Sequence, residues 1–136
     1  MLRKIAIFLV LPLFFGCSQQ RYINYAELEN TCKFPIHLSI SDFSSDREKE
    51  PVQIVVLPNQ KQSIFAYISY GEDLDKIIGD QYFLQASNAK NKIQLTRSDL
   101  LSQLKNSPRN RENRSTYSWQ ISTSSWCAKL SASHGE

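Results

Sequence analysis

The sequence predicts a mainly β fold, either a small antiparallel β-sandwich or a small barrel, with one or two short helices. About six short segments alternate apolar and polar residues, turn-forming residues separate them at regular spacing, and helical periodicity is confined to brief stretches. The 136 residues show no internal repeat and no low-complexity block. We therefore expect a single β-rich domain over residues 22–130.

The first half of this domain contains four predicted strands. Residues 22–30 form the first, with imperfect alternation. Residues 34–43 alternate most clearly, and Pro35 indicates that they begin a strand or lie at a sheet edge. A β-branched run at 52–57 is joined by a turn to a run at 62–70, which predicts a hairpin. Because 62–70 carries apolar side chains on both faces, we expect it to be a central strand.

The second half combines strands with two short helical segments. Residues 72–79 predict one or two helical turns, and Gly79 suits their C-terminal end. The sequence Thr96-Arg-Ser-Asp99 resembles a capping box with Asp in the place of Glu, and it predicts a short helix over 100–104. The remaining strands are predicted at residues 81–87, 92–95 and 116–122, of which the first two form a hairpin.

The first sixteen residues differ from the rest of the chain. Arg3 and Lys4 precede an eleven-residue run, from Ile5 to Phe15, without a charged or polar side chain. This run is too short to span a membrane, which takes about 20 apolar residues. A charged start and an apolar run of this length predict an export signal. The alternative, a buried N-terminal helix, is less favoured because Pro12 interrupts the run.

The end of this run, Phe14-Phe-Gly-Cys17, resembles the lipobox of bacterial lipoproteins. Gly16 fits the small residue required before the cysteine, whereas Phe14 stands where the family usually has Leu. The resemblance implies that residues 1–16 are a cleaved signal peptide and that Cys17 becomes an acylated N-terminus. It also implies a membrane anchor, because each buried acyl CH₂ contributes about 0.8 kcal/mol and several chains hold firmly.

The same resemblance implies a location. Ser18 after the cysteine favours release to the outer membrane of a Gram-negative cell, since Asp there is the usual retention signal. The protein is then expected in the bacterial envelope, on the inner leaflet of the outer membrane, facing the periplasm. Residues 17–21 form a lipidated tether in this interpretation, and residues 131–136 a flexible tail.

If Cys17 carries lipid, two of the three cysteines remain. The periplasm is oxidising, so a disulfide between Cys32 and Cys127 is the natural interpretation. It would close a loop of roughly 95 residues and contribute about 4–5 kcal/mol in the chain-entropy model. Two free buried thiols are the alternative, and ligand spacing does not favour a metal site. We expect the bond to close an open sheet edge, with Trp119 and Trp126 packed near it.

The sequence contains no catalytic motif that we can identify. His37 lies on the polar side of its strand, and no acid or nucleophile is placed to work with it; His134 lies near the C-terminus. The four glycines form no phosphate-binding loop, and no serine lies in a Gly-x-Ser-x-Gly elbow. The acidic cluster Glu72, Asp73 and Asp75 suits the first turn of a helix better than a metal site. We expect no cofactor and no metal.

The charge of the chain does not suggest nucleic acid as a partner. The formal net charge of +3 falls to +1 without the signal peptide. Arg109, Arg111 and Arg114 cluster, and we expect them in a solvated loop instead of a basic binding patch. Asn113-Arg-Ser115 matches a glycosylation sequon, which we interpret as chance in a bacterial lipoprotein.

These patterns favour a non-enzymatic protein-binding module with an unknown protein partner. Its loops at 42–50, 72–80 and 106–115 are the expected contact surfaces. The layout resembles that of small periplasmic lipoproteins, some of which are regarded as immunity proteins against secreted toxins. An inhibitor of an envelope-attacking enzyme belongs to the same class. The alternatives are a structural accessory lipoprotein of an envelope or secretion complex, and an enzyme acting on cell-wall or lipid material.

Overall fold

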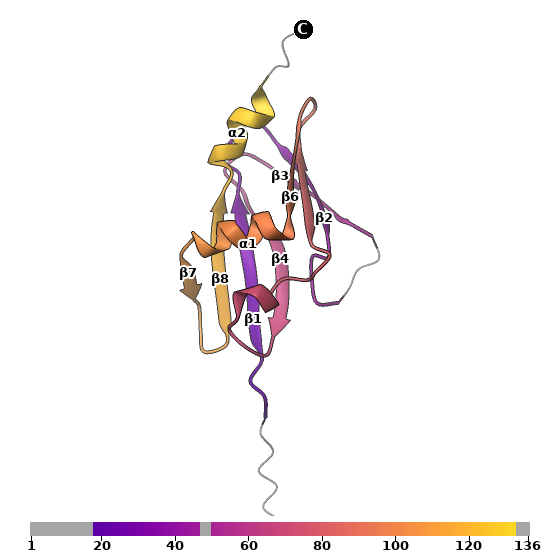
Figure 1. The fold of residues 1–136 in the computed structure, drawn as a ribbon. Coiled ribbons are helices and arrows are strands. Elements are labelled where there is room, and N and C mark those ends of the chain that lie inside the picture. Colours follow the sequence, from indigo (N-terminus) through magenta and orange to yellow (C-terminus); the bar gives the residue numbers. More distant parts are fainter. Residues whose placement is uncertain (1–17, 47–49, 133–136) are drawn as a thin grey trace, which may run out of the picture.

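The computed structural model describes residues 18–46 and 50–132, which form two four-stranded sheets around one core (Figure 1). Sheet A has the strand order β4-β1-β8-β7 and sheet B the order β3-β2-β5-β6. The strands of sheet A are β1 (Tyr22–Glu29), β4 (Lys61–Ser69), β7 (Arg109–Arg111) and β8 (Thr116–Ser122). Those of sheet B are β2 (Ile36–Ser41), β3 (Val52–Val56), β5 (Phe83–Ser87) and β6 (Lys92–Thr96). The expected mainly β fold is confirmed.

The core lies between the inner faces of the two sheets. Strand β2 shows how the sequence produces it, because Ile36, Leu38 and Ile40 are buried while His37 between them is exposed. Pro35 comes directly before this strand, so it marks a strand beginning and not an edge. The β5–β6 hairpin is also confirmed, with Phe83 opposite Thr96 and Ser87 opposite Lys92.

One pair of strands departs from the expected antiparallel arrangement. Strands β1 and β8 run parallel, from Ile23 opposite Thr116 to Glu29 opposite Ser122. Neighbouring strands in the sequence are forced antiparallel by short turns, but these two are separated by most of the domain. These two strands can therefore pair in either direction. The alternation of apolar and polar residues within one strand does not indicate the direction of the strand beside it.

The predicted hairpin between 52–57 and 62–70 is wrong. Strand β3 pairs with β2, and β4 pairs with β1, so the turn between them passes from sheet B to sheet A. Asn59 in this turn has a left-handed φ of 62°, and its backbone N–H donates to the carbonyl of Asn30 at 2.8 Å. The position of the turn was predicted correctly. Its hydrogen bond goes to Asn30, which follows β1, and the turn does not connect two strands of one hairpin.

Strand β4 lies at an edge of sheet A and not at its centre. Its ladder with β1 shifts register at Ala26 and Glu27, so that Ile64 and Phe65 are both buried although they are neighbours. Farther along, Ile68 is half exposed on the outer face. Strand β4 therefore has apolar residues on both faces for two reasons other than burial on both sides. The register shift turns both Ile64 and Phe65 into the core, and Ile68 is exposed on the outer face.

Two helices and one 3₁₀ turn complete the fold. Helix α1 (Arg97–Lys105) begins with the predicted capping box, in which Thr96 and Asp99 bond each other's backbone N–H groups. The 3₁₀ turn η1 (Leu74–Lys76) is shorter than expected. Gly79 has no left-handed φ and so does not cap this turn as expected. It lies against the side chain of Asp42, where a Cβ would collide.

The C-terminal helix α2 (Ser124–Ser131) was not predicted. It buries Trp126 and Leu130, four residues apart on one face, and no side chain caps its start. The burial of Trp119 and Trp126 confirms their expected packing role. Ser131, placed in the flexible tail by the sequence, is the last residue of α2, and residues 133–136 lie outside the described residues. None of the described helices is long and apolar enough to cross a membrane.

Candidate functional site

The most distinctive surface group lies where β7 borders β8, and we call Arg109, Arg111, Tyr117 and Trp119 the arginine edge. The expectation of a solvated loop is wrong for Arg109–Arg111, which form strand β7 and pair antiparallel with β8. Arg109 lies opposite Trp119, and Arg111 opposite Tyr117. The ladder orders a stretch that has no apolar residue of its own.

The two arginines cover aromatic rings at the open side of the core. The Arg109 guanidinium carbon lies 3.7 Å from the ring centroid of Tyr117 and 5.4 Å from that of Trp119. Arg111 lies 5.9 Å from the Tyr117 ring. Both rings are buried, whereas the arginines remain exposed. Cation–π attraction and hydrophobic coverage together hold the guanidinium groups over the rings.

A carboxylate completes this surface group. The Tyr117 hydroxyl donates to Glu72 Oε1 at 2.7 Å, which connects β8 to the loop after β4. This hydrogen bond, together with desolvation of the hydroxyl and the negative charge of Glu72, raises the pKa of Tyr117 above its ordinary value, although the nearby arginines oppose the shift. The ring of Tyr22 lies 5.8 Å away on the other side. Glu72 therefore has a structural partner within the arginine edge.

The other members of the acidic cluster have separate partners. Asp73 accepts from the backbone of Asp75 at the start of η1, and its carboxylate lies 3.7 Å from the Lys76 ammonium. Asp75 pairs with Lys105 of α1 at 3.3 Å. The prediction of acidic residues at a helical start holds for Asp73 and Asp75, whereas Glu72 lies before the turn. Among the described residues, no group of three or more His, Cys, Asp or Glu side chains is placed to hold a metal ion.

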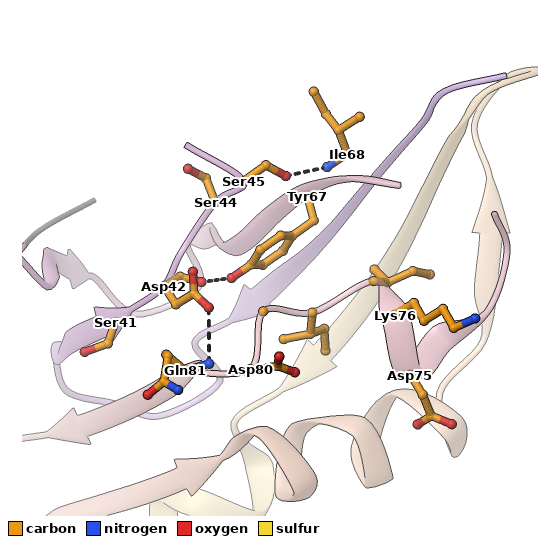
Figure 2. A pocket seen from close by; sticks show the side chains of 13 residues that line it. Ser41, Asp42, Ser44, Ser45, Tyr67, Ile68, Asp75, Lys76, Asp80 and Gln81 are labelled. Atoms are coloured by element: carbon orange, nitrogen blue, oxygen red, sulfur yellow. Dashed lines mark hydrogen bonds between the residues drawn. The ribbon is translucent and has the colours of Figure 1, made fainter. Parts of the chain in front are cut away.

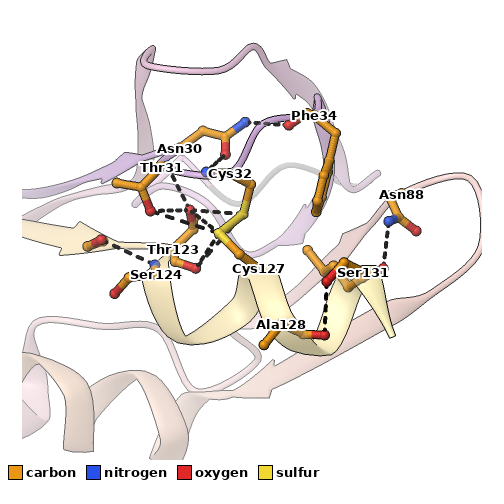
Figure 3. Close-up of a disulfide and its surroundings, with 12 residues drawn as sticks. Asn30, Thr31, Cys32, Phe34, Asn88, Thr123, Ser124, Cys127, Ala128 and Ser131 are labelled. Carbon is orange, nitrogen blue, oxygen red and sulfur yellow. Dashed lines mark hydrogen bonds between the residues drawn. A yellow bond between two sulfur atoms is a disulfide. The ribbon is translucent and has the colours of Figure 1, made fainter. Parts of the chain in front are cut away.

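The disulfide lies at the end of sheet A where β1 and β8 finish. Cys32 and Cys127 are bonded, with their Cα atoms 5.3 Å apart, which confirms the predicted pairing (Figure 3). The bond joins the turn after β1 to helix α2. The expectation that it closes an open edge is wrong, because β1 and β8 are the two central strands of sheet A. Thr123, fully buried beside the bond, accepts from the Thr31 backbone N–H at 2.9 Å.

Asn30 is the polar centre of this end, and nothing in the sequence marked it. The side chain is fully buried, and its amide nitrogen donates to the carbonyls of Phe34 at 2.9 Å and Val56 at 2.8 Å. Its oxygen accepts from the Cys32 backbone N–H at 2.9 Å. Since Asn30 follows β1 and Val56 ends β3, this side chain connects the two sheets.

An open groove of about 820 Å³ is bordered by residues 41–45 and the end of β4 on one side and by the loop of residues 75–81 on the other. Figure 2 shows Asp42 between Tyr67 and Gln81: its carbonyl accepts from the Tyr67 hydroxyl, and its carboxylate accepts from the Gln81 backbone N–H at 3.3 Å. Asp75, Lys76 and Asp80 add charge at the rim, and no histidine or cysteine lines the groove. These groups suit the binding of a polar ligand better than acid–base or nucleophilic chemistry.

The remaining predicted residues do not gather into a site. His37 is exposed on sheet B, and its cross-strand neighbours are Val55 and Ser87, neither of them acidic. Within the sequon, Asn113 Oδ1 accepts from the backbone of Ser115 at 2.9 Å and stabilises a turn. Cys17 and His134 lie outside the described residues.

Comparisons of the chain with protein-family models, with curated proteins and with solved structures find no match. Functional inference therefore depends on the residues and geometry of this chain.

Proposed function

We propose that this protein is a lipoprotein of the bacterial envelope, anchored through Cys17, and that it acts as a non-enzymatic protein-binding module. The anchor is supported by the lipobox-like sequence at residues 14–17, and an oxidising compartment is consistent with the Cys32–Cys127 disulfide. In this proposal the domain faces the periplasm from the inner leaflet of the outer membrane. An immunity protein or an inhibitor of an envelope-attacking enzyme is the preferred role.

The arginine edge supports the binding function. The main supporting observation is that the guanidinium carbon of Arg109, on the exposed strand β7, lies 3.7 Å from the ring centroid of Tyr117. Arg, Tyr and Trp are the residue types that dominate binding energy at protein interfaces. Stacking also limits the freedom of the arginine, so less side-chain entropy is lost when a partner binds. Exposed guanidinium groups on a flat strand edge fit an acidic protein surface, where bidentate pairing with carboxylates is available.

The test is capture of the partner from an envelope extract by the intact protein. Arg109→Gln/Arg111→Gln should weaken capture at least about tenfold, because two central charged anchors are lost. The matched control is Lys90→Gln/Lys129→Gln, which removes the same charge from exposed positions near α2. A partner held equally well by both double variants would contradict the proposed surface.

Two further measurements test the lipid anchor and distinguish between the proposed roles. Cys17→Ser should abolish metabolic palmitate labelling, and labelling that persists would refute the lipid anchor. Deletion that sensitises cells to one toxin or envelope-attacking enzyme supports the immunity or inhibitor role. The alternative, a structural accessory of an envelope or secretion complex, predicts instead an assembly defect and co-purification with several envelope proteins.

A further inference from the structure

The outer face of sheet A carries exposed apolar side chains near the start of β1. Ile23, Ile68 and Tyr70 are 49%, 50% and 54% exposed, and we call these three residues the apolar patch. Ile23 and Ile68 are direct cross-strand partners in the β1–β4 ladder, and Tyr70 follows β4 at the same end. The patch is contiguous in the ladder and is not a scatter of single exposed residues, which would need no explanation.

The character of this face changes along β1. Beyond the patch, the next outward pair is Tyr25 opposite Ala66, followed by Glu27 opposite Ser63 and Glu29 opposite Lys61. In the other direction, the Arg21 guanidinium carbon lies 6.0 Å from the Tyr70 ring centroid. Along the β1–β4 ladder this face therefore runs from a cation on an aromatic ring, through apolar and aromatic side chains, to Glu27 and Glu29. Basic and aromatic side chains beside exposed apolar ones are typical of a surface that rests at the interface of an anionic bilayer.

The patch is also the part of the outer face closest to the proposed anchor. Strand β1 begins at Tyr22, and the chain continues from there toward residue 18 at the lower end of the molecule in Figure 1. Five residues lie between Cys17 and Ile23, and even a fully extended chain spans only about 20 Å between the two. A lipid on Cys17 therefore holds the patch within reach of the bilayer surface, whereas Glu29 at the far end of β1 lies farther away.

We propose that the apolar patch rests on the lipid bilayer into which the Cys17 anchor inserts, so that the domain is held in one orientation on the membrane. This inference depends on the lipid anchor proposed above. Ile23 and Ile68 bury apolar area at the boundary between headgroups and acyl chains. Tyr70 is suited to the interface because its ring is apolar and its hydroxyl is polar, and Arg21 reaches phosphate groups.

The experiment uses the full lipidated chain, extracted from membranes and reconstituted in vesicles of phosphatidylethanolamine and phosphatidylglycerol. Ile68→Trp places a fluorophore in the patch, and Val55→Trp is the matched control, because Val55 is 51% exposed on the outer face of sheet B. Brominated phospholipids quench tryptophan only at lipid contact. We expect at least about twofold stronger quenching of Trp emission in the Ile68→Trp variant, because interfacial side chains enter the outer part of the bilayer.

The possible results separate this inference from the anchor. Equal quenching in an acylated, vesicle-bound protein overturns the membrane contact and leaves the anchor in place. Missing acylation in the mass spectrum refutes the anchor itself. A blue-shifted but unquenched emission that is lost on dilution in the vesicles shows that a second copy covers the patch, which also overturns the proposal. The wild-type signal from buried Trp119 and Trp126 serves as the baseline.

Discussion

The two ends of the β1–β8 pair are held together in different ways. At one end, which we call the disulfide end, the bonds are covalent or buried: Cys32–Cys127 and the three hydrogen bonds of Asn30. At the other, the Tyr22 end, one buried hydrogen bond joins Asn24 to Ser69 at 2.9 Å, and the Tyr117–Glu72 hydrogen bond and the stacked Arg109 lie nearer the surface. The same two central strands are thus cross-linked covalently at one end and held by non-covalent contacts alone at the other.

This difference suggests that one end of the domain stabilises the fold and the other end binds partners. Binding surfaces are generally found in the parts of a protein where local opening requires little free energy. The Tyr22 end contains both proposed contact surfaces, the arginine edge and the apolar patch. The disulfide end buries Asn30 and Thr123 beside the cross-link. We infer that the stability supplied by the disulfide end allows the Tyr22 end to expose aromatic, apolar and charged side chains without destabilising the whole domain.

The largest effect should come from removing the disulfide. Cys32→Ala/Cys127→Ala should lower the free energy of unfolding by about 4–5 kcal/mol, because the bond closes a loop with a sequence separation of 95. Denaturant titration under non-reducing conditions measures it, and reduced wild-type protein should behave like the double variant. A loss below about 1 kcal/mol would mean that the disulfide end does not owe its stability to the cross-link.

A smaller loss is expected from Asn30→Ala. The substitution leaves the buried Val56 carbonyl, the buried Cys32 N–H and the partly buried Phe34 carbonyl without their partner, so the free energy of unfolding should fall by about 3 kcal/mol. The matched control is Asn106→Ala, which removes an exposed side-chain bond to the Ser102 carbonyl and should change stability by less than about 1 kcal/mol. Similar losses in both variants would remove the contrast between buried and exposed polar contacts.

The smallest effect concerns the Tyr22 end and appears at high pH. The raised pKa of Tyr117 means that its contribution to stability is fully present below the unfolded value of about 10 and is lost as the pH rises through the folded pKa. The stability difference between wild type and Tyr117→Phe should therefore be constant at neutral pH and change only above pH 10. Paired urea titrations across this range measure it.

Glu72→Gln provides the control for that pH effect. It removes the negative charge and the charged acceptor that raise the Tyr117 pKa, so phenolate absorbance should develop at lower pH than in the wild type. Tyr82 gives a constant background, because burial raises its pKa. Superimposable phenolate titration curves for the two proteins would show that the contact with Glu72 does not act on Tyr117.

Local patterns in the sequence predicted the strands well but not their partners. Alternation in β2 and β8 reflects one buried face, which a single strand displays by itself. The sheet-to-sheet turn at Asn59 and the parallel β1–β8 pair depend on contacts between distant residues. Asn30 is the clearest case, since a buried asparagine that bonds backbone carbonyls of two later segments has the same local signature as a turn residue.

The two candidate surfaces were only partly visible in the sequence. The arginines were noticed as a cluster, but strand β7 has no apolar residue that would mark it as a strand, and only the neighbouring β8 orders it. The apolar patch was misread as burial on both faces of β4, because exposed and buried isoleucines look alike in a sequence. The disulfide was predicted correctly because the small number of cysteines and the expectation of an oxidising compartment limited the choices.

The parallel pairing of β1 with β8 also dictates the order in which the domain can assemble. The first strand of the chain and the last lie side by side in the middle of sheet A, matched over seven residue pairs. During synthesis, the edge of β1 that pairs with β8 has no hydrogen-bond partner until residues 116–122 have been added. Such long-range pairing slows folding and leaves an unpaired edge open to aggregation or proteolysis. A chain released before Thr116 would therefore lack the strand that completes sheet A.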